Sequence, residues 1–274
     1  MIRDIIRKIL ASSIGGATAC AVNGPRPIRA TAAYALDCVD DRRRIKTVRG
    51  SFTIRTGNQV ERWRADTLFD KEPETIRWLD RTIGADSVFY DVGANIGLYT
   101  LYACHLEPGV RAVCFEPEAL NFARLNLNLC DNRLSDRVLA FSLALSDASG
   151  LATFDLSKFH AGAALHGSHN VTPEAAAHRQ GVVLRPLDDI QETSGLVAPP
   201  THLKIDVDGP EIAVLAGAKG TLAIASLRHV LIETPAEGLP EITAQLGCAG
   251  FVLTDQGVAQ DGVATNYIFE KKVT

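Results

Sequence analysis

The chain has 274 residues, of which 46% are hydrophobic, and its 28 Lys and Arg against 32 Asp and Glu give a formal net charge of −4. This length allows one large or two modest domains with a buried core, and the composition argues against disorder or fibres as whole-chain structures. The mildly acidic balance gives no electrostatic reason to expect nucleic acid as a partner, because affinity for phosphate backbones comes from clustered Lys and Arg.

The N-terminal segment begins with basic residues and a short apolar run, as a poor signal peptide would. Ser12, Ser13, Gly15 and Gly16 interrupt this run. We therefore favour a leading amphipathic helix, which could mediate a homodimer. No stretch of the sequence approaches the roughly 20 continuous apolar residues that span a bilayer, so we expect no membrane partner. The six cysteines lack CxxC spacing, which predicts reduced thiols in the cytoplasm.

The next elements precede the main domain. Residues 47–54 and 60–64 flank a Thr-Gly-Asn turn at 56–58, which predicts a β-hairpin. Pro73 follows an acidic residue and opens a segment with apolar spacing of three or four, which predicts a helix. We expect residues 1–80 to form a helical leader with a hairpin extension, and residues 81–274 to form the main domain.

Short apolar runs alternate with helical patterns from residue 87 onward. The runs lie at 88–90, 112–115, 138–141, 203–207 and 230–232, with two closing strands near 250–253 and 266–270. Continuous apolar strands separated by helices predict a doubly wound α/β fold with a mostly parallel sheet. An insertion at 151–195 follows the third strand, and so long a loop is more often functional or mobile than decorative.

The loop after the first of these strands is the most informative segment. Gly93 and Gly97 are four residues apart with Asn95 between them, which matches a dinucleotide G-x-G-x-x-G fingerprint poorly, and a Walker lysine is absent. Asp91 ends the strand and can accept a hydrogen bond from an ammonium group, which the methionine end of S-adenosylmethionine offers. A simple strand-to-helix turn is the alternative interpretation.

An acidic residue also ends the second parallel strand. Glu116 follows about 25 residues after Asp91, and a carboxylate at that strand tip can accept hydrogen bonds from both ribose hydroxyls of adenosine. Taken alone, Glu116 would more often be a surface acid. Its register with Asp91 makes a role in cofactor binding the stronger interpretation.

Several motifs in order resemble the FkbM family of S-adenosylmethionine-dependent methyltransferases. The matching segments are 91–100, 115–117, 121–128, 144–150 and 203–218, and the resemblance covers roughly residues 85–270. It implies a class I methyltransferase (Rossmann-like) fold, with a seven-stranded sheet that has one antiparallel strand. It also implies methyl transfer to hydroxyl oxygens of sugars, polyketides or related metabolites, and hence a small-molecule acceptor.

The resemblance assigns cofactor-binding residues as well. It implies that the methionine end contacts Asp91, Gly93, Ala94, Asn95 and Gly97, that Glu116 and Asn121 lie at the ribose, and that Ser142, Ala144 and Leu145 border the adenine. Family patterns often have Glu where this chain has Asp208.

Acidic residues at the ends of the fourth and fifth strands are candidates for chemistry. Strand alternation would put Lys204, Asp206 and Asp208 on one side if the strand persists, with Asp206 next to the cofactor as a catalytic residue. Asp208, Glu211 and Glu233 are candidate substrate-binding residues, although Glu211 equally fits a helix first-turn acid. Mg²⁺ bound by Asp206, Asp208 and Glu233 ranks below a metal-free general base.

Histidines in the insertion are the remaining candidates for the base. His160 and His166 lie in a Gly-rich stretch and could deprotonate an alcohol, although solvent-exposed loop histidines are the more common case. Two other functions stay open. An NAD-dependent oxidoreductase lacks support because the dinucleotide fingerprint is missing, and a catalytically silent S-adenosylmethionine-binding scaffold is disfavoured by the intact acidic residues.

Overall fold

The computed structural model describes residues 41–47, 49–156, 160–164, 176–195, 197–258 and 264–272. The predicted leader helix and His166 lie outside the described residues. Residues 43–274 belong to one compact unit. Within the part of the chain that the structure describes, no helix combines the length and the apolar character needed to cross a membrane.

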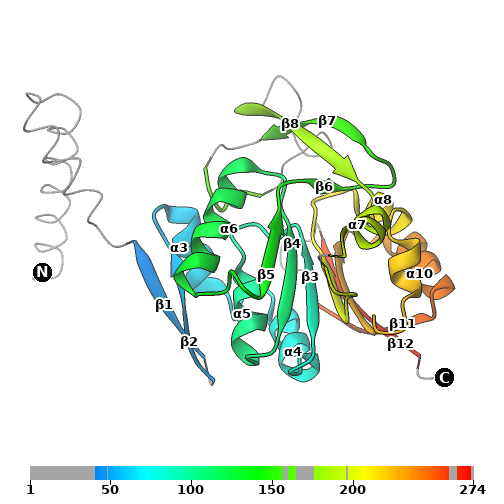
Figure 1. The fold of residues 1–274 in the computed structure, drawn as a ribbon, viewed down its shortest axis with the longest axis horizontal. Helices are drawn as coiled ribbons and strands as arrows, with labels where there is room; N and C mark the ends of the chain where they lie inside the picture. Colours follow the sequence, from blue (N-terminus) through cyan, green and yellow to red (C-terminus); the bar gives the residue numbers. More distant parts are fainter. Residues whose placement is uncertain are drawn as a thin grey trace, which may run out of the picture. The chain divides into compact units, whose positions relative to one another are not determined.

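A seven-stranded sheet forms the centre of the unit (Figure 1). Its strands, in spatial order, are β11 (Phe251–Gln256), β12 (Thr265–Lys271), β10 (His229–Thr234), β9 (His202–Ile205), β3 (Val88–Val92), β4 (Arg111–Phe115) and β5 (Val138–Phe141). β12 runs antiparallel to both of its neighbours, and all other neighbouring pairs are parallel. This order confirms the predicted class I methyltransferase fold with one antiparallel strand.

Helices cover both faces of the sheet. α4 (Pro73–Thr82), α5 (Leu98–Leu106) and α6 (Ala119–Asp131) bury one face, and α7 (Leu187–Ser194), α8 (Glu211–Ala216), α9 (Lys219–Ala223) and α10 (Leu239–Cys248) bury the other. Alternation along β3 divides its side chains between the two cores, because Phe89 packs in the first and Val88, Tyr90 and Val92 pack in the second. Strands buried on both sides account for the continuous apolar runs in the sequence.

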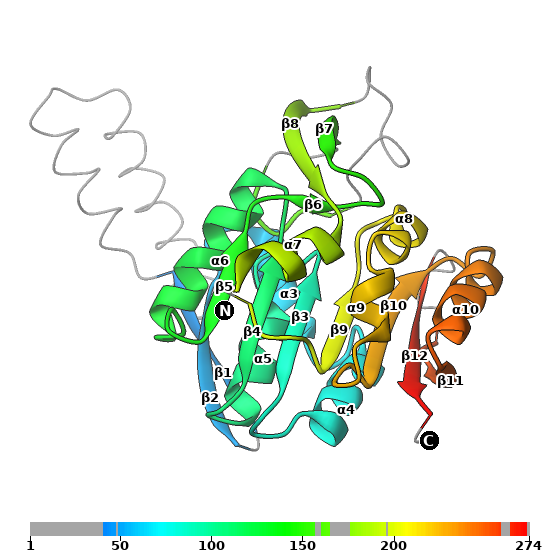
Figure 2. The ribbon, with the colours of Figure 1, turned by 45° about the vertical axis from the view of Figure 1, so that its right-hand side comes forward.

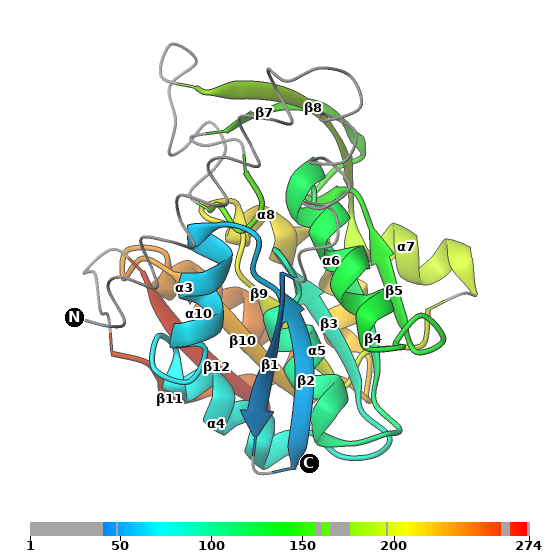
Figure 3. The ribbon, with the colours of Figure 1, turned by 90° about the vertical axis from the view of Figure 1, so that its left-hand side faces the viewer.

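The hairpin before the sheet differs from its prediction. β1 (Arg42–Thr47) pairs with β2 (Gly50–Arg55), whereas residues predicted as its second strand form α3 (Gln59–Thr67). Asn58 and Glu61 make a capping box, in which each side chain accepts the other's backbone N–H, and this starts the helix. β2 packs against α5 and α6, so the structure places the hairpin in the same compact unit as the sheet (Figure 3).

The insertion contains a second, smaller sheet. β6 (Ala144–Leu145), β7 (Gly150–Leu156) and β8 (His178–Arg185) form three strands that continue from the end of β5 (Figure 2). β7 and β8 are antiparallel, and the guanidinium of Arg179 lies 2.6 Å from the Asp155 carboxylate across them. The small sheet therefore follows β5 directly, whereas α7, at the end of the insertion, packs on the main sheet.

Candidate active site

A cavity of about 830 Å³ opens at the carboxyl ends of the parallel strands. Its lining includes Gly93 after β3, Glu116 after β4, Asp206 after β9 and Glu233 near the end of β10. Open α/β sheets bind ligands outside this edge, and the volume falls within the range of small-molecule sites. The cavity is therefore the candidate active site.

The loop after β3 folds tightly against the neighbouring strands. The backbone N–H groups of Gly93 and Ala94 donate to the Phe115 carbonyl oxygen at 2.9 and 3.1 Å. Gly93 has a φ of +81°, and a Cβ there would lie 1.8 Å from the backbone oxygen of Asp206. Only glycine fits this position, because any side chain would collide with β9's end.

Asp91 lies behind this loop, outside the residues that line the cavity. It is 1% exposed, and its Oδ2 accepts a hydrogen bond from the Thr100 hydroxyl at 2.6 Å. Burial raises the pKa of Asp91, and the nearby ammonium of Lys204 opposes that increase. In this structure Asp91 joins β3 to α5 by a hydrogen bond.

Glu116 lines the cavity and is held by two backbone groups. Its Oε2 accepts the N–H of Asn95 at 2.7 Å, and its Oε1 accepts the N–H of Glu118 at 2.8 Å. Burial raises the pKa of Glu116 to about 8, against the lowering effect of these hydrogen bonds. Each carboxyl oxygen keeps further acceptor capacity toward a ligand. The wall beyond it is apolar and consists of Phe115, Leu143, Ala144 and Leu145.

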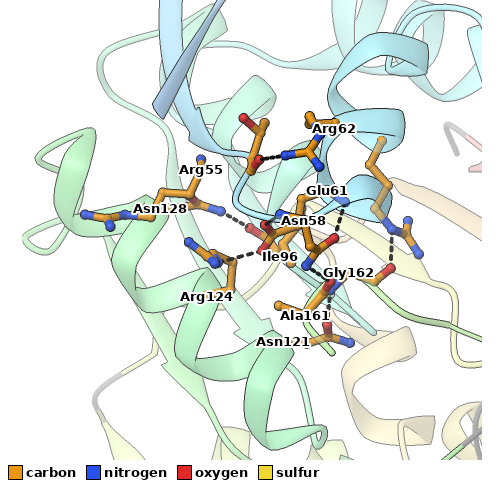
Figure 4. Close-up of polar contacts among 12 residues, drawn as sticks. Arg55, Asn58, Glu61, Arg62, Ile96, Asn121, Arg124, Asn128, Ala161 and Gly162 are labelled. Atoms are coloured by element: carbon orange, nitrogen blue, oxygen red, sulfur yellow. Dashed lines mark hydrogen bonds and ion pairs between the residues drawn. The ribbon is translucent and has the colours of Figure 1, made fainter. Parts of the chain in front are cut away.

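Residues 160–164, here called the anchored segment, line the cavity opposite the sheet. Carbonyl oxygens of residues 161, 162 and 163 accept from the side chains of Asn58 (2.8 Å), Arg64 (2.6 Å) and Asn95 (2.8 Å), respectively. The Asn121 side chain accepts the N–H of residue 162 at 2.7 Å (Figure 4). Side chains from α3, α6 and the loop after β3 thus fix one short stretch of the insertion.

His160 begins the anchored segment and lines the cavity. Its Nδ1 is buried, and the described residues offer it no hydrogen-bond partner. A neutral imidazole in this position can accept a proton from a ligand hydroxyl.

Three carboxylates from distant parts of the chain meet beside the loop after β3. Ligand oxygens of Glu72, Asp206 and Glu233 lie within 4.8 Å of one another. Two ammonium groups already contact them, since Lys71 Nζ is 2.6 Å from Glu72 Oε1 and Lys204 Nζ is 2.7 Å from Asp206 Oδ2. Because each lysine compensates one carboxylate, we assign no metal to this cluster.

Electrostatic coupling within this cluster shifts the pKa values of Asp206 and Glu233 in opposite directions. Burial alone would raise the pKa of Asp206, but the ammonium of Lys204 outweighs it and holds that pKa well below its usual range. The charge of Asp206, followed by burial, raises the pKa of Glu233 to about 10. At neutral pH Asp206 is therefore an ionised acceptor and Glu233 a protonated donor.

The turn after β9 departs from the expected alternation. β9 ends at Ile205, and Asp208 adopts a left-handed backbone with a φ of +58°. The strand therefore does not persist to Asp208, so the condition under which Lys204, Asp206 and Asp208 would share one face is not met, although Asp208 still lines the cavity. Glu211 is buried, accepts the N–H of Gly209 at 2.7 Å and does not line the cavity. These contacts support the helix-start role of Glu211.

The cavity brings together most of the residues singled out in the sequence. Those in its lining are Gly93, Asn95, Glu116, Asn121, Ala144, Leu145, His160, Asp206, Asp208 and Glu233. Ala94 lines a smaller chamber of about 30 Å³ that shares several lining residues with the cavity. Asp91, Gly97, Ser142 and Glu211 lie outside both linings.

Sequence reasoning missed the contribution of the region before the sheet. Trp63 and Arg64 of α3 line the cavity, as do Lys71 and Glu72 between α3 and α4. Glu72 was interpreted only as an acid that precedes a helix. The sequence offers no local signal that would mark Lys71 and Glu72 as cavity residues, because a charged pair before a proline-started helix is a common pattern.

The chain is similar in sequence to known methyltransferases. A family model described as "Methyltransferase FkbM domain" matches residues 91–250. Over 195 residues the chain is 31% identical to the hexuronic acid methyltransferase AglP of Haloferax volcanii, which covers 71% of this chain and 74% of that protein. It is 33% identical over 195 residues to the 31-O-demethyl-FK506 methyltransferase FkbM of Streptomyces tacrolimicus, which covers 61% of this chain and 73% of that protein.

Among solved structures, the chain is similar to the methyltransferase FkbM from Methylobacillus flagellatus KT, with 17% sequence identity and a TM-score of 0.48. The match covers 77% of this chain and 54% of that chain, so this chain spans about half the length of that protein.

Proposed function

The chain belongs to the FkbM family of methyltransferases, and we propose that it transfers the methyl group of S-adenosylmethionine to a hydroxyl oxygen of a sugar or a related secondary metabolite. The observation that carries the proposal is the juxtaposition of Glu116 with the glycine loop, where the Asn95 N–H holds Glu116 Oε2 at 2.7 Å on the cavity wall. The names of two relatives, a hexuronic acid methyltransferase and a 31-O-demethyl-FK506 methyltransferase, support a hydroxyl acceptor.

The chemistry of the lining fits such a cofactor. Glu116 offers acceptor oxygens for ribose hydroxyls, and the apolar residues 143–145 offer a surface for a flat base. Gly93 and Asn95 lie between that surface and the charged cluster, where the methionine end would bind. When bound, S-adenosylmethionine supplies a methyl group on a sulfonium sulfur.

Transfer to an alcohol requires that the hydroxyl be aligned and its proton be removed. We assign the removal of that proton to His160, whose side chain lines the same cavity and whose buried Nδ1 is without a hydrogen-bond partner in the described residues. Asp206 is a weak base next to Lys204, so it orients the acceptor by accepting hydrogen bonds from it. Glu233 donates a hydrogen bond to Asp206. Asp208 lies on the acceptor side of the lining. His166 remains a sequence-based candidate.

Trp63 forms part of the outer wall on the acceptor side. It is 48% exposed and lines the cavity together with Phe154 and Val258. Large aromatic surfaces beside polar groups suit a ring-shaped acceptor that has an apolar face and hydroxyl edges. We also propose a cytoplasmic location, which the free thiols of Cys104 and Cys114 support.

Calorimetric titration tests the cofactor first. Wild-type protein should bind S-adenosylmethionine and S-adenosylhomocysteine with micromolar Kd, Glu116→Ala should lose most of that affinity, and NAD should not bind. An acceptor screen, begun with D-glucuronate, would follow. A folded wild-type protein that binds neither adenosyl compound would overturn the proposal, whereas one that binds both and methylates no acceptor would favour the scaffold function.

A further inference from the structure

A small chamber adjoins the cavity beside the loop after β3. Its volume is about 30 Å³, far below that of the cavity, so it can hold an end of a ligand but not a whole ligand. Six residues line both the chamber and the cavity: Arg64, Lys71, Glu72, Gly93, Asn95 and Asp206. A ligand in the cavity therefore has direct access to the chamber.

Charged side chains of both signs line this chamber, because Arg64, Lys71 and Lys204 are cationic and Glu72 and Asp206 are anionic. Lys71 and Glu72 form one ion pair at 2.6 Å, and Lys204 and Asp206 form a second at 2.7 Å. Glu72 and Lys204 are 4% and 1% exposed, and Lys204 Nζ also lies 4.9 Å from the ring centre of Tyr99. Glu72 and Lys204 are thus shielded from solvent and act strongly on a neighbouring ligand, whereas Lys71 and Asp206 are partly exposed.

This arrangement discriminates between kinds of ligand. A metal ion would meet three cationic side chains, and a simple anion would meet two carboxylates, so each would be repelled by part of the charged lining. An α-amino acid end carries an ammonium and a carboxylate a few ångströms apart, and it can contact both signs at once. The chamber is therefore complementary to a zwitterion.

We propose that Lys71 and Glu72 bind the amino-acid end of the cofactor, with the Lys71 ammonium on its carboxylate and the Glu72 carboxylate on its ammonium. The assignment rests on the proposed function. Lys71 can serve because its side chain is 33% exposed and its ammonium has three donors, one of which goes to Glu72. Asp91, the residue that the sequence suggested for the ammonium, lines neither the chamber nor the cavity, and its Oδ2 accepts from Thr100 behind the loop.

A pair of ligands isolates this interaction. S-Adenosylhomocysteine has the amino-acid end, whereas 5′-methylthioadenosine retains the adenosine and the sulfur but lacks that end. Lys71→Met should raise the Kd of S-adenosylhomocysteine about 10-fold to 100-fold, because hydrogen bonds between charged groups are the strong ones. The same substitution should leave the Kd of 5′-methylthioadenosine within about twofold of wild type, as read by calorimetry.

Glu72→Gln should show the same pattern, and Lys71→Arg, which keeps the charge, should retain most of the affinity. Lys219→Met, on the exposed start of α9, is the matched control and should bind both compounds as wild type does. If Lys71→Met and Glu72→Gln bind S-adenosylhomocysteine like wild type, or weaken both compounds equally, the assignment is wrong. If wild type binds neither compound, the proposed function is wrong, and the assignment of Lys71 and Glu72, which rests on it, is wrong as well.

Discussion

The raised pKa of Glu116 predicts a pH-dependent contribution to stability that a single substitution can isolate. The carboxyl has an ordinary pKa of 4.5 and a pKa of about 8 in the folded protein. Between these values the folded state keeps a proton that the unfolded state has released, so the free energy of unfolding falls as pH rises through this window. About 3.5 pH units (8 minus 4.5), at about 1.4 kcal/mol each, give a loss on the order of 5 kcal/mol.

Glu116→Gln removes the ionisable group and nearly keeps its shape. We therefore expect the free energy of unfolding of wild type, minus that of the variant, to fall by several kcal/mol between pH 5 and pH 9, measured by urea unfolding at each pH. At low pH the variant should be less stable by about 1 to 3 kcal/mol, because its amide group faces a backbone N–H. Glu241→Gln on the exposed face of α10 is the control. A difference that stays constant with pH would refute the burial argument.

Three further predictions concern the loop, the acidic cluster and the outer wall. Gly93→Ala should destabilise the protein by about 3 kcal/mol or more in denaturant unfolding, because the new Cβ would collide with a backbone oxygen 1.8 Å away; a loss below about 1 kcal/mol would contradict the packing of the loop. Adding EDTA or Mg²⁺ should change the Kd of S-adenosylhomocysteine less than twofold, because lysines already neutralise the charges of Glu72 and Asp206. A tenfold change would indicate that the acidic cluster binds a metal. Iodide should quench the exposed Trp63 but not the buried Trp78, and a saturating acceptor found in the screen should reduce that quenching roughly twofold; quenching that ignores the bound acceptor would place Trp63 outside the acceptor wall.

The sheet and the cofactor wall were predictable because their signals are local. Strands buried on both faces appear as unbroken apolar runs, and the residue that ends each parallel strand must lie at one edge of the sheet. Gly93, Glu116 and Asp206 follow from that rule, and the structure brings all three to one cavity. Which of them faces a ligand was harder to predict, and Asp91, one residue inside its strand, turned toward α5 instead.

The segment before the sheet was harder to predict from the sequence, because its function depends on tertiary contacts. The pattern at residues 60–64 is too short to separate a strand from a helix, and the capping box between Asn58 and Glu61 is the local signal that decides for a helix. Lys71 and Glu72 have no such signal. Their position beside Asp206 arises from the packing of α4, and a helix-start acid in any other context would look the same in the sequence.

The hydrogen bonds of the anchored segment link two ligand sites energetically. Asn95 and Asn121 belong to the wall assigned to the cofactor, whereas Asn58 caps α3 and Arg64 lies in α3, the helix whose Trp63 we proposed for the acceptor wall. All four side chains hold one stretch of five residues, so a shift of either wall is transmitted to the other. We expect positive cooperativity, in which S-adenosylhomocysteine tightens acceptor binding and the acceptor tightens cofactor binding by the same factor.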